Sequence, residues 1–286
     1  MQIGIGLPAN IPGVQGKLIV DWAKKADSSP FSSLGLIDRL VYPNYEPLIA
    51  LAAVAGVTHR IRLMTTVLLA TLRNTAILAK QAASLDALSG GRLTLGLGIG
   101  AREDDFHAAS TSFRNRGKRF EEQLETMKRI WSGQPLAENV GPVGPSPVRP
   151  GGPEILIGGY THAAIQRVGL WGDGYISGGG GPQRAQHGFK TAEESWKAAG
   201  RSGKPRLVGC MYFALGPDAK ERGGSYLQNY YGQGHWVDAM INSLPITPEA
   251  IKGLIQAYSD IGTDEVILWP CITDLEQIDQ LAELLG

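Results

Sequence analysis

The chain contains few of the residues that bind metals or form cross-links. Only two cysteines occur among its 286 residues, Cys210 and Cys271, and they lie far apart, each within an apolar run. Neither belongs to a CxxC pair or to a Cys/His cluster with metal-ligand spacing, and the five histidines include no HExxH pair. We therefore expect two buried thiols in a reducing compartment and no metal centre.

An excess of one charge is also missing. Lys+Arg and Asp+Glu both number 27, so the formal net charge is +0. A neutral chain has no overall electrostatic attraction to nucleic acids or to anionic membranes. No apolar run reaches the length of a membrane span, and the chain begins with the strand-like residues 1–7 rather than a basic, cleavable leader. These absences predict a cytoplasmic protein with no nucleic-acid or membrane partner.

The chain does contain a regular alternation of short apolar, β-branched runs and longer segments of helical period. The expected strands are 2–7, 34–37, 61–69, 92–98, 154–157, 174–177, 206–215 and 265–268. The expected helices are 16–28, 47–57, 76–88, 119–131, 162–171, 183–199, 218–231, 248–261 and 275–285.

Eight strands, each followed by a helix, predict an α/β fold of the closed (β/α)₈ TIM-barrel type. A doubly wound sheet alternates in the same way, but it usually has fewer strands at this length, and no glycine fingerprint follows the first strand here. The Gly/Pro-rich segment 133–153 resembles a linker, yet the alternation resumes directly after it. We therefore expect a surface loop there and one domain over residues 1–286.

Active sites of such barrels lie at the C-terminal ends of the strands. Asp38 and Arg39 follow the second strand, where they form either a rim ion pair or an acid/base site with Asp38 as the proton-transfer group. Thr66 and Val67 lie near the end of the third strand, where apolar side chains and hydroxyls suit a flat ligand with polar edges.

Glycines alternate along the fourth strand at positions 96, 98 and 100, so all three point to one face. Such a face lets a planar ring approach the backbone, but alternating glycines also fit a crowded barrel interior, and both interpretations remain open. After the sixth strand, the glycine-rich residues 177–182 indicate either a flexible lid or a close approach of the backbone to a ligand.

Two segments are candidate phosphate sites. Gly158, Gly159, Tyr160 and Thr161 follow the fifth strand and precede a helix, where free backbone amides bind anions. The alternative is ordinary N-capping by Thr161. The second segment is a basic cluster after the fourth strand, which binds phosphate or is simply solvated. The cluster contains Arg102, Arg114, Arg116, Lys118 and Arg119.

The segment 78–100, LAKQAASLDALSGGRLTLGLGIG, resembles the signature of the luciferase-like monooxygenases. That family includes bacterial luciferase, FMN-dependent monooxygenases and deazaflavin-dependent oxidoreductases. Further similarity lies in IGIGLP at 3–8, IGG at 157–159 with WGDG at 171–174, and LWP at 268–270. The resemblance implies a luciferase-like (β/α)₈ barrel that holds a flavin or deazaflavin at its strand ends.

The resemblance also implies roles for residues. The Thr66–Val67 bulge would lie against the cofactor ring, often with a non-proline cis peptide, and Arg102 and Arg119 match the arginines that bind its phosphate. Two residues depart from the family pattern. Asp38 stands where many members have histidine, and Tyr160 stands where small hydroxyl residues are frequent. The candidate cofactor-binding residues are Thr66, Val67, Gly98, Ile99, Gly100, Arg102, Arg119, Gly158, Gly159, Tyr160 and Thr161.

The resulting functional prediction is a monooxygenase acting on a small hydrophobic or aromatic organic substrate. It would use reduced FMN supplied by a separate flavin reductase, and the family implies a homo-oligomer. A competing hypothesis is hydride transfer with a deazaflavin (coenzyme F420), in which oxygen is not activated. A non-catalytic flavin-binding barrel and a barrel lyase or isomerase that binds a sugar phosphate are also compatible with the sequence.

Overall fold

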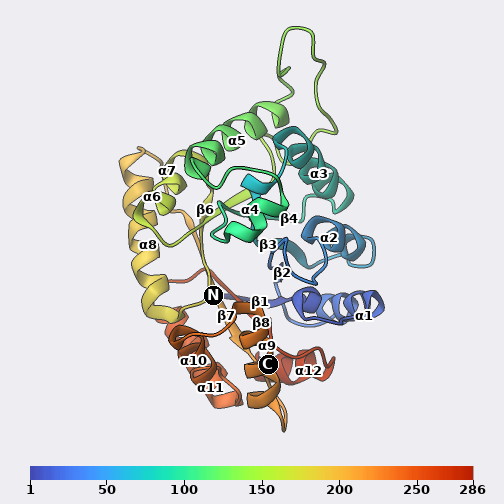
Figure 1. Ribbon diagram of the computed structural model, residues 1–286, viewed down its shortest axis with the longest axis vertical. Helices are drawn as coiled ribbons and strands as arrows, with labels where there is room; N and C mark the ends of the chain where they lie inside the picture. Colours follow the sequence, from blue (N-terminus) through green and yellow to red (C-terminus); the bar gives the residue numbers. More distant parts are fainter. Residues whose placement is uncertain (286) are drawn as a thin grey trace.

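Eight parallel strands pair in chain order, and β8 returns to pair with β1 (Figure 1). The computed structural model describes residues 1–285. This closed barrel confirms the predicted fold. The strands are β1 (Gln2–Gly6), β2 (Ser33–Leu36), β3 (Arg62–Leu69), β4 (Leu93–Gly98), β5 (Glu154–Gly158), β6 (Gly174–Ser177), β7 (Arg206–Phe213) and β8 (Glu265–Pro270).

Helices surround the barrel and connect successive strands (Figure 1). The expected helix 162–171 is two short helices, while α4 and α10 lie in segments where no helix was expected. The helices are α1 (Gly16–Asp27), α2 (Pro47–Ala55), α3 (Thr75–Leu88), α4 (Glu103–Ala108), α5 (Arg116–Trp131), α6 (His162–Ile165), α7 (Arg167–Trp171), α8 (Gly181–Ala198), α9 (Ala219–Tyr231), α10 (His235–Asn242), α11 (Pro248–Asp260) and α12 (Glu276–Leu285), with short 3₁₀ turns η1 (Pro8–Asn10) and η2 (Ala70–Leu72).

Two buried layers follow from the alternation of side chains along each strand. One layer fills the barrel interior, where Met64, Val208 and Ile267 have no exposed surface. The other layer lies between strands and helices and includes the fully buried Trp22 and Leu124. Parallel strands covered on both faces must be apolar on both faces, which explains the nearly continuous hydrophobic runs of the sequence.

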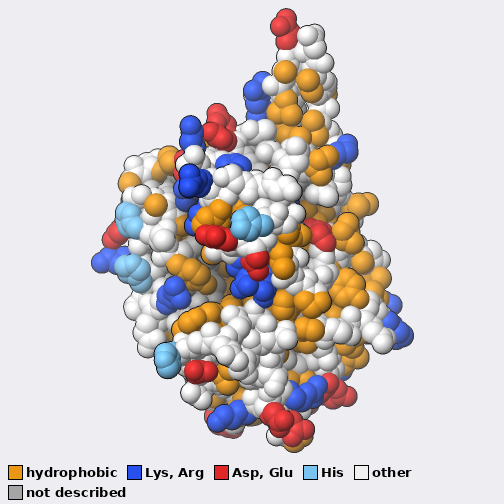
Figure 2. Space-filling model, in the orientation of Figure 1, with side chains coloured by type: hydrophobic (Ala, Val, Ile, Leu, Met, Phe, Trp, Pro, Cys, Tyr) orange, Lys and Arg blue, Asp and Glu red, His pale blue; other side chains and the backbone are white. Residues whose placement is uncertain are grey.

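The segment between α5 and β5 projects from the body beside α3 (Figure 1). Near its base the Val148 amide donates a hydrogen bond of 2.8 Å to Asp86 on α3. Hydrophobic side chains also line the flank formed by α2 and α3 (Figure 2), where Ile49, Ile77 and Leu88 are exposed.

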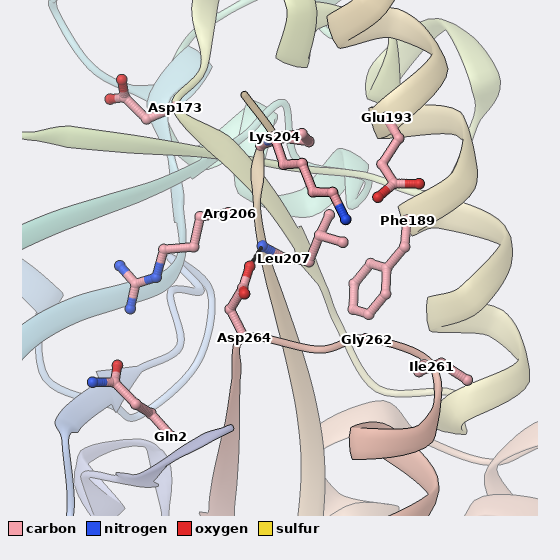
Figure 3. Close-up of a pocket in the computed structure, with 11 residues that line it drawn as sticks. Gln2, Asp173, Phe189, Glu193, Lys204, Arg206, Leu207, Ile261, Gly262 and Asp264 are labelled. Carbon is pink, nitrogen blue, oxygen red and sulfur yellow. Dashed lines mark hydrogen bonds between the residues drawn. The ribbon is translucent and has the colours of Figure 1, made fainter. Parts of the chain in front are cut away.

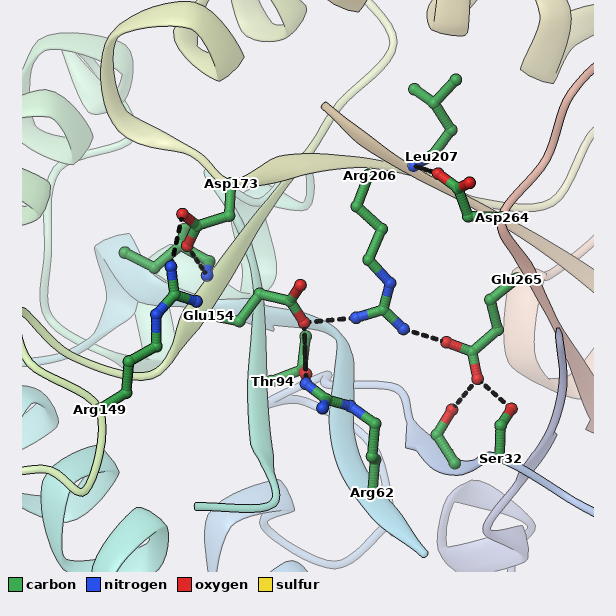
Figure 4. Close-up of polar contacts among 12 residues, drawn as sticks. Ser32, Arg62, Thr94, Arg149, Glu154, Asp173, Arg206, Leu207, Asp264 and Glu265 are labelled. Atoms are coloured by element: carbon green, nitrogen blue, oxygen red, sulfur yellow. Dashed lines mark hydrogen bonds and ion pairs between the residues drawn. The ribbon is translucent and has the colours of Figure 1, made fainter. Parts of the chain in front are cut away.

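A network of charges closes the barrel at the N-terminal ends of its strands (Figure 4). Arg206 donates to both Glu154 and Glu265, and Arg62 donates to Glu154 across 3.0 Å. The carboxylate of Glu265 is fully buried and also accepts from Ser33. Arg62 is thus a second cation for Glu154, and a serine hydroxyl is a further donor to Glu265. These partners offset the cost of placing the two carboxylates at the end of an apolar barrel.

A cavity of about 640 Å³ opens at the same end of the barrel, beside Gln2, Lys204 and Asp264. Figure 3 shows Lys204 and Glu193 on one side of it and Arg206 and Gln2 on the other. This end is opposite to the strand ends that carry catalysis in barrels. We therefore assign it to the stability of the fold and not to the functional site.

The charge network predicts a large loss of stability when Arg206 is replaced. Arg206→Met leaves the fully buried Glu265 carboxylate without its cation and Glu154 with Arg62 alone, so the free energy of unfolding should fall by about 3–5 kcal/mol. Urea denaturation followed by circular dichroism measures it. Lys204→Met, two residues away and outside the ion pairs, is the control and should change stability by less than about 0.5 kcal/mol. Equal stability of the two variants would contradict the role of Arg206.

Candidate functional site

The end of β3 has an irregular backbone. The Thr66–Val67 peptide is cis, as the resemblance implied, and the register of β3 on β4 shifts between Thr65 and Leu68. Thr66 is buried, and its hydroxyl accepts a hydrogen bond of 3.1 Å from the indole Nε1 of Trp269 at the end of β8. The irregular segment is therefore held from across the barrel mouth.

The side chain of Val67 fills the space that glycines leave on the next two strands. A Cβ placed on Gly98 would lie 2.9 Å from Val67 Cγ2, and one on Gly158 would lie 2.7 Å from Val67 Cγ1. A Cβ on Gly96 would lie 2.1 Å from the Thr65 carbonyl oxygen. These glycines therefore make room for β3, which is the crowded-interior interpretation of the alternating pattern.

Gly100 differs from the other two glycines of this series. It lies beyond β4 with a φ of +72°, a conformation that favours glycine, and it is partly exposed. Ile99 and Val67 are partly exposed as well. All three residues lie at the adjacent ends of β3 and β4, where they form a partly exposed apolar surface that a flat ligand can reach. Val67 packs against the barrel-interior layer, whereas Ile99 packs against the layer beneath the helices.

Asp38 lies at the end of β2 with a side chain only 3% exposed. Its Oδ2 accepts hydrogen bonds from the Leu69 amide and from Arg73, both at 2.8 Å, and Arg73 also contacts Glu46 at 2.9 Å. Burial raises the pKa of the Asp38 carboxyl above its ordinary value, although Arg73 and the Leu69 amide act to lower it. Its partner is therefore Arg73 and not the neighbouring Arg39, and proton transfer by Asp38 stays a prediction.

The basic cluster after β4 divides into two groups. Arg102 is exposed and pairs with Asp104 at 3.3 Å. Arg119 is partly buried, its guanidinium donates to the Ser112 carbonyl at 2.6 Å, and its Nε is buried with no hydrogen-bond partner within residues 1–285. A buried donor without a partner has the chemistry of an anion site.

Arg116 is an arginine that the sequence did not single out from this cluster. It donates to the Gly100 carbonyl at 3.2 Å and to the Phe113 carbonyl at 3.1 Å, and its guanidinium lies 3.8 Å from the centre of the Phe113 ring. Arg116 therefore holds the loop after β4 in place.

In the loop after β5, Thr161 acts as an ordinary helix N-cap, and its neighbours make further contacts. Thr161 caps α6 by accepting the Ala164 amide at 3.2 Å, and the Gly159 carbonyl accepts from the Tyr175 hydroxyl at 2.8 Å. Burial raises the pKa of Tyr175 to about 12, so this hydroxyl stays a donor. Tyr160 is half exposed, and the guanidinium of Arg184 lies 3.9 Å from the centre of its ring.

An aromatic cluster lies at the C-terminal ends of β7 and β8 and was missed by the sequence reasoning. It joins tyrosines of α9 to Tyr212 of β7 and Trp269 of β8. Tyr212 and Tyr231 share a hydrogen bond of 2.9 Å between their hydroxyls, and the Tyr212 ring lies 5.0 Å from that of Trp269. Arg39 stacks on Tyr230, with 5.2 Å from its guanidinium carbon to the ring centre. The signal available was the group of tyrosines at 226, 230 and 231 on one predicted helix.

Within residues 1–285, no three His, Cys, Asp or Glu side chains come together to hold a metal ion. In the same part of the chain, no helix has both the length and the apolar character that a membrane span requires. Both cysteines are buried, and burial raises the pKa of each thiol well above its ordinary value.

The packing of Val67 against the glycines predicts a specific rescue. Gly158→Ala should lower the free energy of unfolding by about 1–3 kcal/mol because its new methyl group overlaps Val67. Val67→Ala should restore most of that loss in the double variant, as measured by denaturant unfolding.

Gly174→Ala is the control, because its methyl group would lie 2.1 Å from the Arg206 carbonyl oxygen and does not meet Val67. Val67→Ala should leave the Gly174→Ala defect unchanged. Equal rescue of both glycine variants, or of neither, would disprove the assigned contact.

Comparison with known proteins gives a matching family model, sequence relatives and solved structures of the same fold. The model of a family described as luciferase-like monooxygenase matches residues 1–269. An uncharacterized protein of Mycobacterium tuberculosis is 29% identical over 213 residues, covering 63% of this chain and 72% of the relative.

Two solved structures share the fold. The coenzyme F420-dependent tetrahydromethanopterin reductase from Methanopyrus kandleri superposes with a TM-score of 0.81 at 17% identity, covering 99% of this chain and 97% of the other. The oxygenating constituent of 3,6-diketocamphane monooxygenase from Pseudomonas putida, in complex with FMN, gives a TM-score of 0.76 at 16% identity, with 100% and 96% coverage. Structural neighbours thus bind either a deazaflavin or FMN.

Proposed function

The chain belongs to the luciferase-like monooxygenase family, and on this premise we propose that it oxygenates a small hydrophobic or aromatic organic molecule with reduced FMN. A separate flavin reductase would supply the reduced cofactor. The observation that carries the proposal is the combination at one barrel mouth of an apolar surface at Val67, Ile99 and Gly100 with a buried guanidinium donor on Arg119 that lacks a partner within the described residues.

The residues present fit a flavin. The apolar surface would hold the ring, while Arg119 and the backbone amides around Gly159 and Thr161 would hold the phosphate. Arg102 remains a second candidate for the phosphate, since its contact with Asp104 is exposed and can be exchanged. When bound, reduced FMN supplies the electrons that activate oxygen, and the protein supplies binding, orientation and exclusion of water.

The chain's own residues have three tasks in this proposal. The aromatic cluster of α9, β7 and β8 would exclude water from the reacting groups. Trp269 holds the Thr66–Val67 segment in its irregular conformation. Asp38 would hold or move a proton at its carboxylate, with Arg73 limiting its motion.

The second candidate function is hydride transfer with a deazaflavin. The similarity in fold to the F420-dependent reductase supports it. The same apolar surface and the same arginines would serve both cofactors, because both have a flat tricyclic ring and a phosphate. Side-by-side binding measurements with the two cofactors distinguish the two functions.

We expect the purified protein to bind reduced FMN or the deazaflavin when both are titrated side by side by fluorescence. Arg119→Met should lower the affinity for the cofactor by roughly 10- to 150-fold, which corresponds to a charged hydrogen bond of about 1.5–3 kcal/mol. Arg102→Met tests the second candidate in the same way. Arg114→Met, an exposed arginine of the same segment, is the control. Binding of neither cofactor would refute both candidate functions, and binding of the deazaflavin alone would refute oxygenation with FMN.

A role of Asp38 in proton transfer predicts a pH dependence. Its pKa lies above the ordinary 3.8, and only the carboxylate accepts a proton, so turnover should rise as the pH increases through that raised pKa. Asp38→Asn should remove this rise and lower turnover by roughly 10²- to 10⁴-fold. The pH profile is taken with an aliphatic aldehyde and an aromatic ketone as trial substrates.

Glu46→Gln is the control for this experiment, because Glu46 contacts Arg73 through a different guanidinium nitrogen from the one that donates to Asp38. It should keep the rise of turnover with pH. An Asp38→Asn variant with the wild-type profile would show that Asp38 only positions Leu69 and Arg73.

A further inference from the structure

A cavity of about 580 Å³ lies beside the barrel mouth, among the loops after β5 and β6, strand β7, and helices α10 and α11. Tyr212 lines it, and the ring of Tyr212 also packs against Trp269, which holds Thr66. The cavity and the candidate cofactor surface are therefore linked by a shared aromatic wall. Its volume is in the range of pockets that bury an organic molecule.

The walls of this cavity are aromatic and aliphatic. Tyr212, Tyr231 and Trp236 contribute rings, and Met240 and Leu244 contribute flexible apolar surface. The two tyrosine hydroxyls bond to each other, and burial raises the pKa of both, so they remain uncharged. Such a lining favours a ligand with a planar apolar body.

One charged side chain, Arg184, belongs to the lining, and no aspartate or glutamate among residues 1–285 does. Its guanidinium carbon lies 3.9 Å from the centre of the Tyr160 ring. A guanidinium held beside a ring can still donate its N–H groups to an anion. In the same part of the chain, no carboxylate forms an ion pair with Arg184. The first turn of α8, which carries Arg184, also contains no acidic residue.

We propose that this cavity binds the organic substrate, and that the substrate is an aromatic or polycyclic molecule with one anionic group, such as a carboxylate, which meets Arg184. The ring system lies against Tyr212, Tyr231 and Trp236, on the side of the cavity that adjoins the cofactor surface. A cationic substrate is disfavoured because the described lining offers no negative charge. This inference rests on the proposed function and adds the substrate class to it.

The test uses the full chain without cofactor and two matched probes, 2-naphthoate and the neutral 2-naphthamide, in calorimetric titrations. We expect naphthoate to bind about tenfold more tightly than naphthamide, as for one exposed charged hydrogen bond. Arg184→Met should bring naphthoate down to the affinity of naphthamide and leave naphthamide unchanged. Lys190→Met, an exposed cation further along α8, is the control and should preserve the difference.

A second variant tests the cavity itself. Met240→Trp adds volume to the lining and should lower the affinity for both probes. The melting temperature of this variant reports whether the fold is intact. Equal affinity for the two probes, an unchanged naphthoate affinity in Arg184→Met, or no binding of either at millimolar concentration would each overturn the inference.

The same preparation titrated with FMN and the deazaflavin separates this inference from the proposed function. Cofactor binding without naphthoate binding refutes the substrate site alone. Naphthoate binding that depends on Arg184, without binding of either cofactor, refutes the flavin-dependent function and with it the assignment of the ligand as that enzyme's substrate.

Discussion

The contact between Val67 and the glycines of β4 and β5 is the constraint on which the shape of the mouth depends. The bulge of β3 turns this side chain into the space beside Gly98 and Gly158, and any larger residue there would push the three strands apart. The hydrogen bond from Trp269 to Thr66 holds the same segment from β8. Packing across four strands thus forms the surface that a flat ligand would contact. Dense packing of this kind makes the surface rigid.

The charges are arranged differently at the two ends of the barrel, and this difference supports the division of their roles. At the N-terminal end, Arg206 and two glutamates satisfy one another in a closed network. At the C-terminal end, Arg73 is paired with Asp38 and Glu46, but the rim also has Arg119, whose buried Nε lacks a partner within the described residues, and Arg184, which forms no ion pair there. Charges that are already paired stabilise a fold, whereas cations with free donors at an apolar mouth can bind an anionic ligand.

Much of the fold could be predicted because eight apolar runs alternate with helical segments, and strand ends in a barrel meet on one side. That rule correctly grouped Asp38, Thr66 and Gly100 at one end. It could not distinguish a glycine that admits a ligand from one that admits Val67, because both patterns look the same along one strand. The partner of Asp38 is Arg73, 35 positions away, and no local pattern connects them. The tyrosines of α9 and the cavity near Arg184 likewise depend on how loops pack together.

The central claim is that a flavin-type ring lies against Val67, Ile99 and Gly100 at the C-terminal mouth. A crystal structure of the protein with bound FMN or deazaflavin tests this most directly. The account predicts ring density on that surface, with the phosphate within hydrogen-bond distance of Arg119 or Arg102. Cofactor density in the cavity beside Gln2 and Lys204, at the other end of the barrel, would contradict it.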